Sequence, residues 1–225
     1  MLVKDWMSKN VVTVNEDTSM MEASQTLREK RVKRLPVLDK KGRLVGIVSD
    51  RDIKAASPSK ATTLDVHELY YILAKVKVKE VMTKKPIAAS PDDTMEKAAV
   101  IMLEKDIGGL PVLDDKETLV GILTQGDVFR MLTSITGIYQ GGVLFAFELE
   151  DRGGSIKEVA DVLRAAGGRM NSILTSYHNV PPGWRHLHIR ALEIPEGKLP
   201  ALVEELKSKF RFLYLVKDEL KGIKK

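Results

Sequence analysis

Residues 34–52 read RLPVLDKKGRLVGIVSDRD, and residues 109–127 read GLPVLDDKETLVGILTQGD. The two stretches are related by a shift of 75 residues, and the same shift aligns residues 3–53 with residues 78–128 without a gap. About 20 of these 51 aligned positions are identical. Such a repeat predicts two copies of one structural unit within a single chain.

Each copy carries the same local pattern. A short apolar strand, at residues 11–14 or 86–89, precedes an amphipathic helix, and Ser19 and Glu22 have capping-box spacing in the first copy. Two apolar strands and a second helix follow, so each copy is predicted to be β-α-β-β-α. Units of about 50 residues are too small to bury their own faces, so we expect them to pack on each other with pseudo-two-fold symmetry. We place repeat one at about residues 1–57, a connection at 54–77, and repeat two at about 78–136.

Residues 142–218 have a different pattern and follow a turn-rich stretch, GIYQGG. Their apolar periodicity predicts the order β-α-β-β-α-β, which is ferredoxin-like. Ser155 and Glu158 have capping-box spacing at the start of the first helix of this region. A basic tail, residues 219–225, ends the chain. The expected fold class is therefore α+β or α/β throughout.

The composition excludes several classes of function. The chain has no cysteine, which excludes disulfides and thiolate chemistry. Its net charge is +5, but the basic residues alternate with acidic ones and aromatic residues make up 5%, which disfavours nucleic acid as a partner. No stretch reaches the roughly 18 apolar residues of a membrane span, and the first residues lack the apolar core of a signal peptide. We therefore expect a cytoplasmic protein that does not bind membranes.

The duplicated LPVLD and LVGI segments, each followed by Ser or Thr and then by Asp three residues later, resemble a tandem pair of CBS motifs, the Bateman module. This resemblance covers residues 1–136. Residues 142–218 resemble an ACT domain, a small-molecule-sensing fold of amino-acid metabolism, through the loop EDRGGS before a helix and GGRMNSIL after it. The whole arrangement resembles the AcuB-type proteins of acetoin utilisation.

Two hydroxyl–carboxylate pairs lie where a strand is expected to pass into a helix: Ser49 with Asp52, and Thr124 with Asp127. Side chains three residues apart at a helix start can face the same cleft. A carboxylate can accept hydrogen bonds from both hydroxyls of a ribose cis-diol, and free N–H groups at a helix start suit phosphate. The resemblance implies that these four residues hold the ribose and first phosphate of an adenosine ligand. The alternative, that they only cap their helices, stays open.

The resemblance also implies which residues contact the base and the phosphates. Adenine is expected between four apolar residues, Val11, Val12, Pro86 and Ile87. A basic residue just before the Leu-Pro dipeptide often reaches phosphates in the family, which indicates Arg34, with Lys33 and Arg51 as further candidates. Repeat two has glycine at all three equivalent positions, so the two sites are not expected to be equivalent. The alternative is that these basic residues are solvated surface groups.

The ACT-like region offers a second candidate site. An amino acid could bind at a subunit interface through Asp151, Gly153, Gly154 and Asn171, although a tight turn explains the glycines equally well. His186 and His188 share one face of a predicted strand, a spacing that can bind metal, but no third ligand accompanies them. We therefore expect no metal site.

These features favour a non-catalytic regulatory protein, because Walker A, GxGxxG, GxSxG and HExxH motifs are all absent from the sequence. The resemblance implies that AMP, ADP or ATP binds in the CBS cleft, with no required cofactor and with Mg²⁺ at most as a companion of the nucleotide. An S-adenosylmethionine-type ligand and a ligand-free interaction module are the alternatives. The resemblance further implies a homodimer and an unidentified regulated protein, in acetoin or related carbon metabolism.

Overall fold

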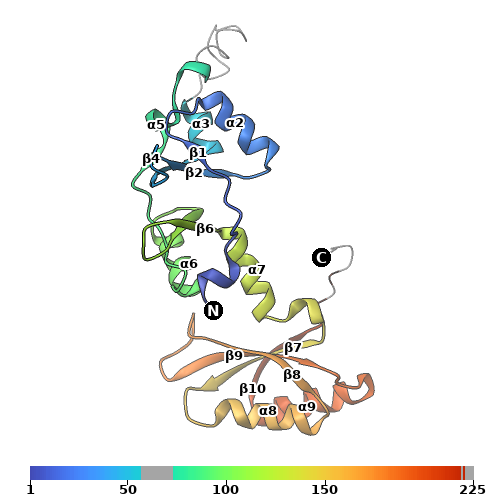
Figure 1. Cartoon of the computed structure of the whole chain (residues 1–225). Coiled ribbons are helices and arrows are strands. Elements are labelled where there is room, and N and C mark those ends of the chain that lie inside the picture. Colours follow the sequence, from blue (N-terminus) through green and yellow to red (C-terminus); the bar gives the residue numbers. More distant parts are fainter. Residues whose placement is uncertain (57–72, 219, 221–225) are drawn as a thin grey trace. The chain divides into compact units, whose positions relative to one another are not determined.

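The computed structural model describes residues 1–56, 73–218 and 220. Most of the predicted connection at 54–77, and nearly all of the predicted tail at 219–225, lie outside these described residues. The chain divides into two compact units, Met1–Val128 and Phe129–Lys225, which we call the N-terminal and C-terminal units (Figure 1). The division falls within helix α7, whereas the sequence placed the end of the repeats at residue 136.

The helices and the two longer strands of the two repeats correspond under the 75-residue shift, whereas their short first strands do not. Repeat one contains α1 (Val3–Trp6), β1 (Val14–Asn15), α2 (Met20–Glu29), β2 (Arg34–Leu38), β3 (Leu44–Ser49) and α3 (Asp50–Ala56). Repeat two contains α5 (Val78–Val81), β4 (Thr83–Lys84), α6 (Met95–Glu104), β5 (Gly109–Leu113), β6 (Leu119–Thr124) and α7 (Gln125–Ile135). The short helices α1 and α5 were not predicted from the sequence.

The caps and apolar faces of α2 and α6 follow the predicted pattern. Ser19 caps α2 in a reciprocal capping box with Glu22, which confirms that prediction, and the Thr94 hydroxyl accepts from the Lys97 N–H at the start of α6. The buried faces of these helices carry Met20, Ala23 and Leu27 in α2, and Met95, Ala98 and Met102 in α6. Apolar residues at helical spacing thus place both helices against their strands.

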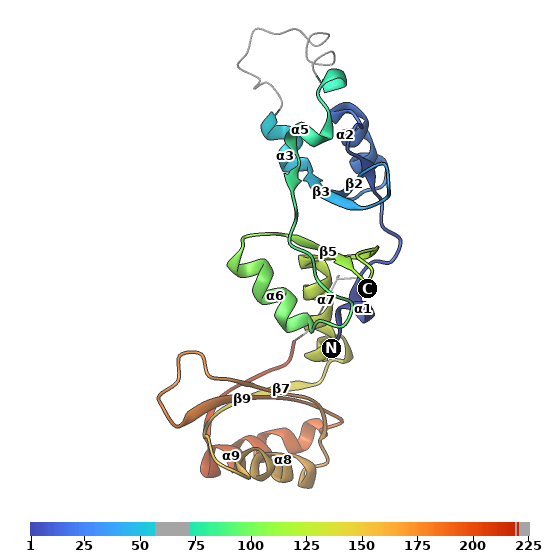
Figure 2. The ribbon, with the colours of Figure 1, turned by 60° about the vertical axis from the view of Figure 1, so that its left-hand side comes forward.

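The first ten or so residues of each repeat, at 1–10 and 76–85, form an arm that pairs with the other repeat. In the first arm, the Val3 N–H donates to the Asp93 carbonyl at 2.9 Å, and Ser8 forms a β-bridge with Ile122. In the second arm, the Val78 N–H donates to the Thr18 carbonyl at 2.8 Å, and β4 pairs with β3. Figure 2 shows α5 beside α3, and α1 apart from the other elements of repeat one. The two arms are therefore exchanged.

The exchange also shortens the first strand of each repeat. Strands were predicted at residues 11–14 and 86–89, but the structure has β1 only at Val14–Asn15, and β4 at Thr83–Lys84 within the arm. Residues 11–14 and 86–89 connect each arm, which pairs with one repeat, to the rest of its own repeat. They therefore form few backbone hydrogen bonds with neighbouring strands. Ala89 forms a single bridge with Val112.

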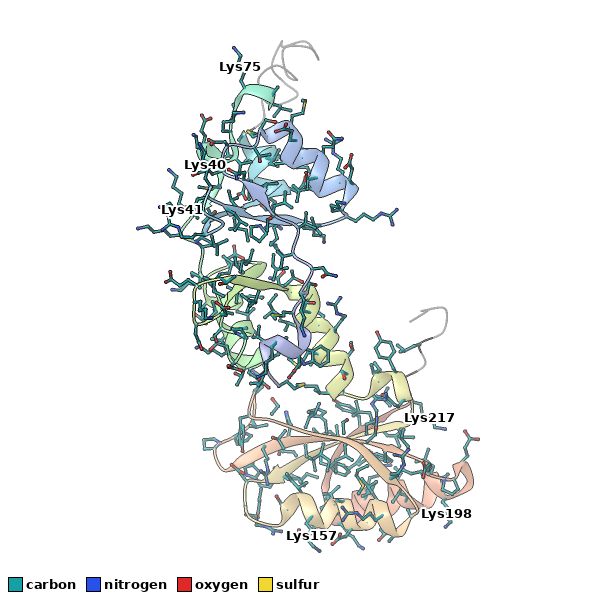
Figure 3. The ribbon with its side chains drawn as sticks, in the orientation of Figure 1. Lys40, Lys41, Lys75, Lys157, Lys198 and Lys217 are labelled. Carbon is teal, nitrogen blue, oxygen red and sulfur yellow. The ribbon has the colours of Figure 1, made fainter. Side chains whose placement is uncertain are left out.

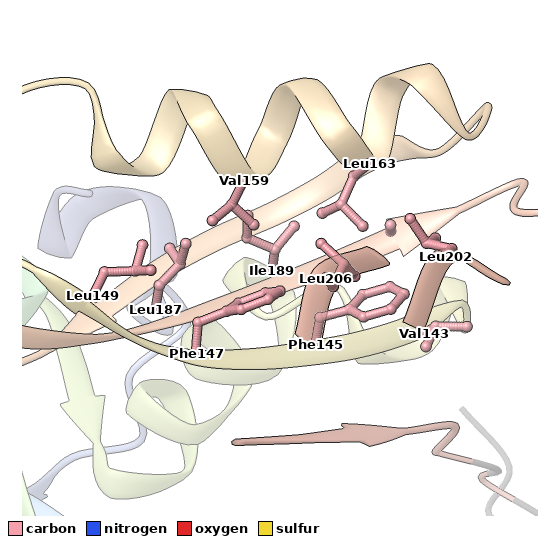
Figure 4. Packing of buried hydrophobic residues seen from close by; sticks show 11 residues of the cluster. Val143, Phe145, Phe147, Leu149, Val159, Leu163, Leu187, Ile189, Leu202 and Leu206 are labelled. Carbon is pink, nitrogen blue, oxygen red and sulfur yellow. The ribbon is translucent and has the colours of Figure 1, made fainter. Parts of the chain in front are cut away.

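The C-terminal unit has the predicted β-α-β-β-α-β order: β7 (Val143–Glu150), α8 (Ser155–Ala165), β8 (Arg169–Ser176), β9 (Trp184–Leu192), α9 (Leu199–Lys209) and β10 (Arg211–Val216). Its four strands are antiparallel in the order β10-β7-β9-β8. Side chains of α8 and α9 meet one face of the sheet around Phe145, Phe147 and Ile189, all with 0% exposure (Figure 4). The other face carries His186 and His188.

The start of α8 differs from the prediction. Gly154, at φ +89°, is the N-cap, and Ser155 is the first helical residue. Glu158 does not complete a capping box, because both of its carboxylate oxygens accept from the Arg152 guanidinium at 2.8 Å. The bidentate pair thus replaces the predicted capping box.

Exposed lysines are spread over both units. Figure 3 shows six of them pointing outward: Lys40, Lys41, Lys75, Lys157, Lys198 and Lys217. Several lie beside acids, as Lys40 does with Asp17 at 3.7 Å and Lys217 with Glu196 at 3.1 Å. Among the described residues, no helix has the length and apolar character needed to cross a membrane.

Candidate ligand-binding cavities

The N-terminal unit contains two cavities built from equivalent residues. The first, of about 370 Å³, is lined by Ser8, Asn10, Val11, Val12, Arg31, Val32, Lys33, Arg34, Gly108, Ile122, Thr124, Gln125 and Gly126. The second, of about 480 Å³, is lined by Arg34, Ile47, Ser49, Arg51, Asp52, Thr83, Lys85, Pro86, Ile87, Lys105, Asp106, Ile107, Gly108 and Gly109. Both volumes lie in the range of small-molecule sites.

Each cavity combines parts of both repeats. The first brings Val11 and Val12 of repeat one against Thr124 of repeat two. The second brings Pro86 and Ile87 of repeat two against Ser49 of repeat one. The predicted base-contacting residues therefore lie with the predicted hydroxyl residue of the other repeat, a combination that local sequence patterns do not reveal.

Ser49 and Asp52 are joined at the junction of β3 and α3. The Ser49 N–H and its hydroxyl both donate to Asp52 Oδ2 at 2.7 Å, and the Asp52 N–H donates to Ser49 Oγ at 3.3 Å. This reciprocal arrangement is a capping box, so the capping explanation holds for this pair. It occupies one carboxylate oxygen; Asp52 Oδ1 has no hydrogen-bond partner among the described residues, and Asp52 lines the second cavity. The carboxylate can therefore cap α3 and still accept a hydrogen bond from a ligand.

Thr124 and Asp127 form the same hydrogen bonds to the carboxylate as Ser49 and Asp52 do, but Asp127 is buried. The Thr124 N–H and hydroxyl donate to Asp127 Oδ2 at 2.7 and 2.6 Å. Asp127 is 1% exposed and does not line the first cavity, whereas Thr124 does. In this pair the hydroxyl is the group that a ligand can reach, and the buried carboxylate fixes its orientation.

The cations are shared between the cavities rather than confined to one. Lys33 lines the first cavity, Arg51 lines the second, and Arg34 lines both. Burial lowers the pKa of the Arg34 guanidinium from its ordinary value, the charge of Arg51 lowers it further, and Asp52 acts in the opposite direction. All three predicted phosphate-binding candidates therefore line a cavity, and Arg34 borders both.

Sequence reasoning missed three further basic residues that line the cavities. Arg31 lines the first cavity, and Lys85 and Lys105 line the second. A signal was available, because Lys85 directly precedes Pro86 and Arg31 lies three residues before Arg34. Asp106, the equivalent of Arg31 under the 75-residue shift, lines the second cavity and gives it an acidic group that the first lacks at this position.

A family model for the CBS domain matches residues 3–59 and 78–134, which are the two repeats. The chain belongs to the CBS domain family. A CBS domain-containing protein of Dictyostelium discoideum is 35% identical over 134 residues, which cover 60% of this chain and 92% of that protein. These matches confirm the predicted tandem CBS pair.

Solved CBS structures are similar to the same part of the chain. The CBS-pair protein CBSX2 from Arabidopsis thaliana is 34% identical with a TM-score of 0.50, and the alignment covers 60% of this chain and 96% of that one. A structure of CBSX2 in complex with AMP is 36% identical with a TM-score of 0.49, covering 60% and 98%. The similarity thus spans the CBS pair.

Outside the CBS pair, the structure does not bring the four candidate residues of the ACT-like region together. Asp151 follows Glu150, which pairs with Trp184 at the start of β9. Its Oδ1 atom lies 3.2 Å from Arg185 Nη1. The Asn171 side chain instead donates to the Gly137 carbonyl at 3.3 Å, and its neighbour Ser172 pairs with Arg190 near the end of β9.

The loop of Gly153 and Gly154 is held by groups of its own unit. Arg185, which sequence reasoning missed, donates through Nη2 to Ser155 Oγ at 2.9 Å. A Cβ at Gly153 would meet nothing within 4 Å, so space does not require glycine there, whereas the φ of +89° at Gly154 favours it. The tight-turn explanation therefore accounts for Gly154.

The two histidines of β9 lie side by side on the face of the C-terminal sheet opposite α8 and α9. Their rings are 6.2 Å apart in an edge-on arrangement, and His188 Nε2 lies 3.2 Å from the Tyr214 hydroxyl. Within the described part of the chain, no group of three or more His, Asp or Glu side chains is placed to hold a metal ion.

We expect acid to destabilise the C-terminal unit through His188. Burial lowers the pKa of His188 below its ordinary value of 6.5, and His186 lowers it further. The unfolded chain therefore binds the proton at a higher pH than the folded chain, so this contribution to stability is complete above pH 6.5 and is lost as the pH falls below it. Lowering the pH from about 7.5 to about 5.5 should reduce the Tm of this unit more in the wild type than in His188→Gln, by thermal denaturation. Equal reductions would contradict the assignment.

Proposed function

We propose that this protein is a non-catalytic sensor in which the CBS pair binds adenine nucleotides in its two cavities. The observation that carries the proposal is the composition of the second cavity. It combines the apolar pair Pro86 and Ile87, the carboxylate of Asp52 with an unused oxygen, and the cations Arg34 and Arg51. These groups suit, respectively, the faces of a base, the hydroxyls of a ribose and a phosphate.

The first cavity also suits a nucleotide, but it offers a hydroxyl in place of the carboxylate. It has the apolar pair Val11 and Val12, and the Thr124 hydroxyl oriented by Asp127. The cations Arg31, Lys33 and Arg34 also line it, which favours an anionic nucleotide over the positively charged S-adenosylmethionine. ADP or ATP in either cavity could bring Mg²⁺ with its phosphates, and a ligand-free interaction module is the alternative.

The test is calorimetric titration of the full-length protein with AMP, ADP, ATP and S-adenosylmethionine. We expect Asp52→Ala to weaken AMP binding in the second cavity by about tenfold to a hundredfold, because a charge-assisted hydrogen bond contributes about 1.5–3 kcal/mol. At a hundred times its dissociation constant, AMP should stabilise the wild type by about 2.7 kcal/mol.

Asp50→Ala is the matched control, because it removes the same charge from the same helix. Asp50 pairs with Lys54 at the surface and does not line either cavity. We expect it to change AMP affinity by less than about twofold. Unchanged affinity in Asp52→Ala would reject the role of the carboxylate, and no response to any nucleotide would favour the ligand-free module.

We further propose that residues 142–218 form an ACT-like domain that follows a CBS pair at 1–136. The element order and the antiparallel strand order β10-β7-β9-β8, with both helices on one face, support this. The domain would act as a second sensor or as a dimerisation unit of a homodimer in the cytoplasm. The AcuB-type resemblance makes acetoin or related carbon metabolism the proposed setting of the regulated partner protein.

A further inference from the structure

Arg34 and Gly108 form a wall that the two cavities share. Arg34 belongs to β2 of repeat one, where it pairs with Ser49, and its side chain reaches the loop before β5 of repeat two. There Arg34 Nη1 donates to the carbonyl oxygen of Gly108. Both residues line both cavities, so one guanidinium borders two candidate binding sites.

The two glycines of repeat two make room for this side chain. A Cβ at Gly108 would collide with Arg34 Nη2, and a Cβ at Gly109 would lie 2.9 Å from Arg34 Cδ. A Cβ at either position would therefore displace the Arg34 side chain, so these two glycines leave room for it, and neither has the positive φ that would itself favour glycine. The second repeat has glycines where the first has basic residues, and the Arg34 side chain of the first repeat fills the space beside these glycines.

The charge of Arg34 is poorly compensated by the protein. Its hydrogen bond goes to a neutral carbonyl, and no carboxylate of the described residues lies within salt-bridge distance of its guanidinium. The nearest charges that act on it include Arg51, which repels it, and Asp52, which attracts it. A half-buried guanidinium with this surrounding favours an anion from outside the protein.

We propose that Arg34 couples the two cavities negatively, because a phosphate held by this guanidinium in one cavity weakens phosphate binding in the other. The inference rests on the proposed nucleotide binding. One guanidinium can turn toward either cavity, and once neutralised by the first phosphate it attracts the second less. Coupling between sites typically changes affinity by 5–150-fold, and we expect about tenfold here. Adenosine carries no phosphate, so it should show no coupling.

The test follows each cavity separately by methyl NMR of the full-length protein, with Val12 as reporter of the first cavity and Ile87 as reporter of the second. Asp52→Ala weakens the second cavity and Thr124→Ala weakens the first, so each variant shows how the remaining cavity binds alone. Of the two cavities, the one that fills later in the wild type should bind AMP about tenfold more tightly when its neighbour is disabled. In the Arg34→Ala background this gain should disappear.

Lys33→Ala is the matched control, since Lys33 precedes Arg34 but lines only the first cavity. It should weaken AMP binding there and leave the gain intact. If each cavity gave the same AMP titration curve in the wild type as in the variant whose other cavity is disabled, the coupling would be overturned. The AMP-induced methyl shifts would still support nucleotide binding. A gain that survives in Arg34→Ala, or that adenosine shows equally, would also overturn the coupling. If neither methyl responded to AMP, the proposed function itself would fail, and the coupling with it.

Discussion

Replacing Phe147 with alanine is expected to lower the free energy of unfolding of the C-terminal unit by about 3–5 kcal/mol. The Phe147 ring is 0% exposed and makes edge-to-face contacts with Phe210 and Phe212, at centroid distances of 6.0 and 5.5 Å. Its removal loses the transfer free energy of a large aromatic side chain and leaves a cavity between the sheet and α9.

Urea unfolding followed by the fluorescence of Trp184 measures this effect. Trp6 and Trp184 are the only tryptophans, so a Trp6→Phe background assigns the signal to the C-terminal unit. Phe129→Ala is the control, because Phe129 is 64% exposed and its loss should change the free energy of unfolding by less than about 0.5 kcal/mol. Similar losses in both variants would contradict the assignment of Phe147 to the core.

Gly142→Ala should lower the free energy of unfolding of the same unit by about 2–4 kcal/mol, from backbone strain and overpacking together. Gly142 has φ +81°, and a Cβ there would collide with the carbonyl oxygen of Ala191, the β9 residue that pairs with Val143. Because the obstacle is backbone within a sheet, relief requires the two strands to separate at this point. The same urea titration measures the loss.

Gly141→Ala separates strain from collision. Gly141 has φ +74°, close to that of Gly142, but a Cβ there would meet nothing within 4 Å. With ψ −138° its conformation is one that mainly glycine adopts, so its substitution should show only the strain, about 1–3 kcal/mol. If the two variants lost the same stability, the collision with Ala191 would contribute nothing.

Sequence patterns were sufficient where structure depends on neighbouring residues. The runs around Leu35 and Leu44 became β2 and β3 because an apolar strand, a tight turn and a second apolar strand are all encoded locally. Ser19 capped α2 for the same reason. The 75-residue shift also relates Ser8, Val11 and Thr124 of the first cavity to Thr83, Pro86 and Ser49 of the second. The strand and helix order of the C-terminal unit also followed from local periodicity.

The parts that sequence reasoning missed depend on distant contacts. Nothing local to Val3 or Val78 indicates which of the two repeats it packs against, because the two arms have similar sequences. The burial of Asp127, against the cavity-lining position of Asp52, likewise depends on groups from elsewhere in the fold. Arg190 alternates with histidines along β9 like a solvent-facing residue, yet it is 2% exposed and bonds the carbonyls of Thr136 and Gly141.

The exchanged arms have a consequence for how such a chain could arise. Val78 belongs by sequence to repeat two, but it lies in the buried apolar cluster of repeat one with 0% exposure. A lone ancestral copy could complete its sheet and core only by borrowing this segment from a second molecule. Gene duplication and fusion would have made this exchange of arms intramolecular. The charges of each half could then change independently.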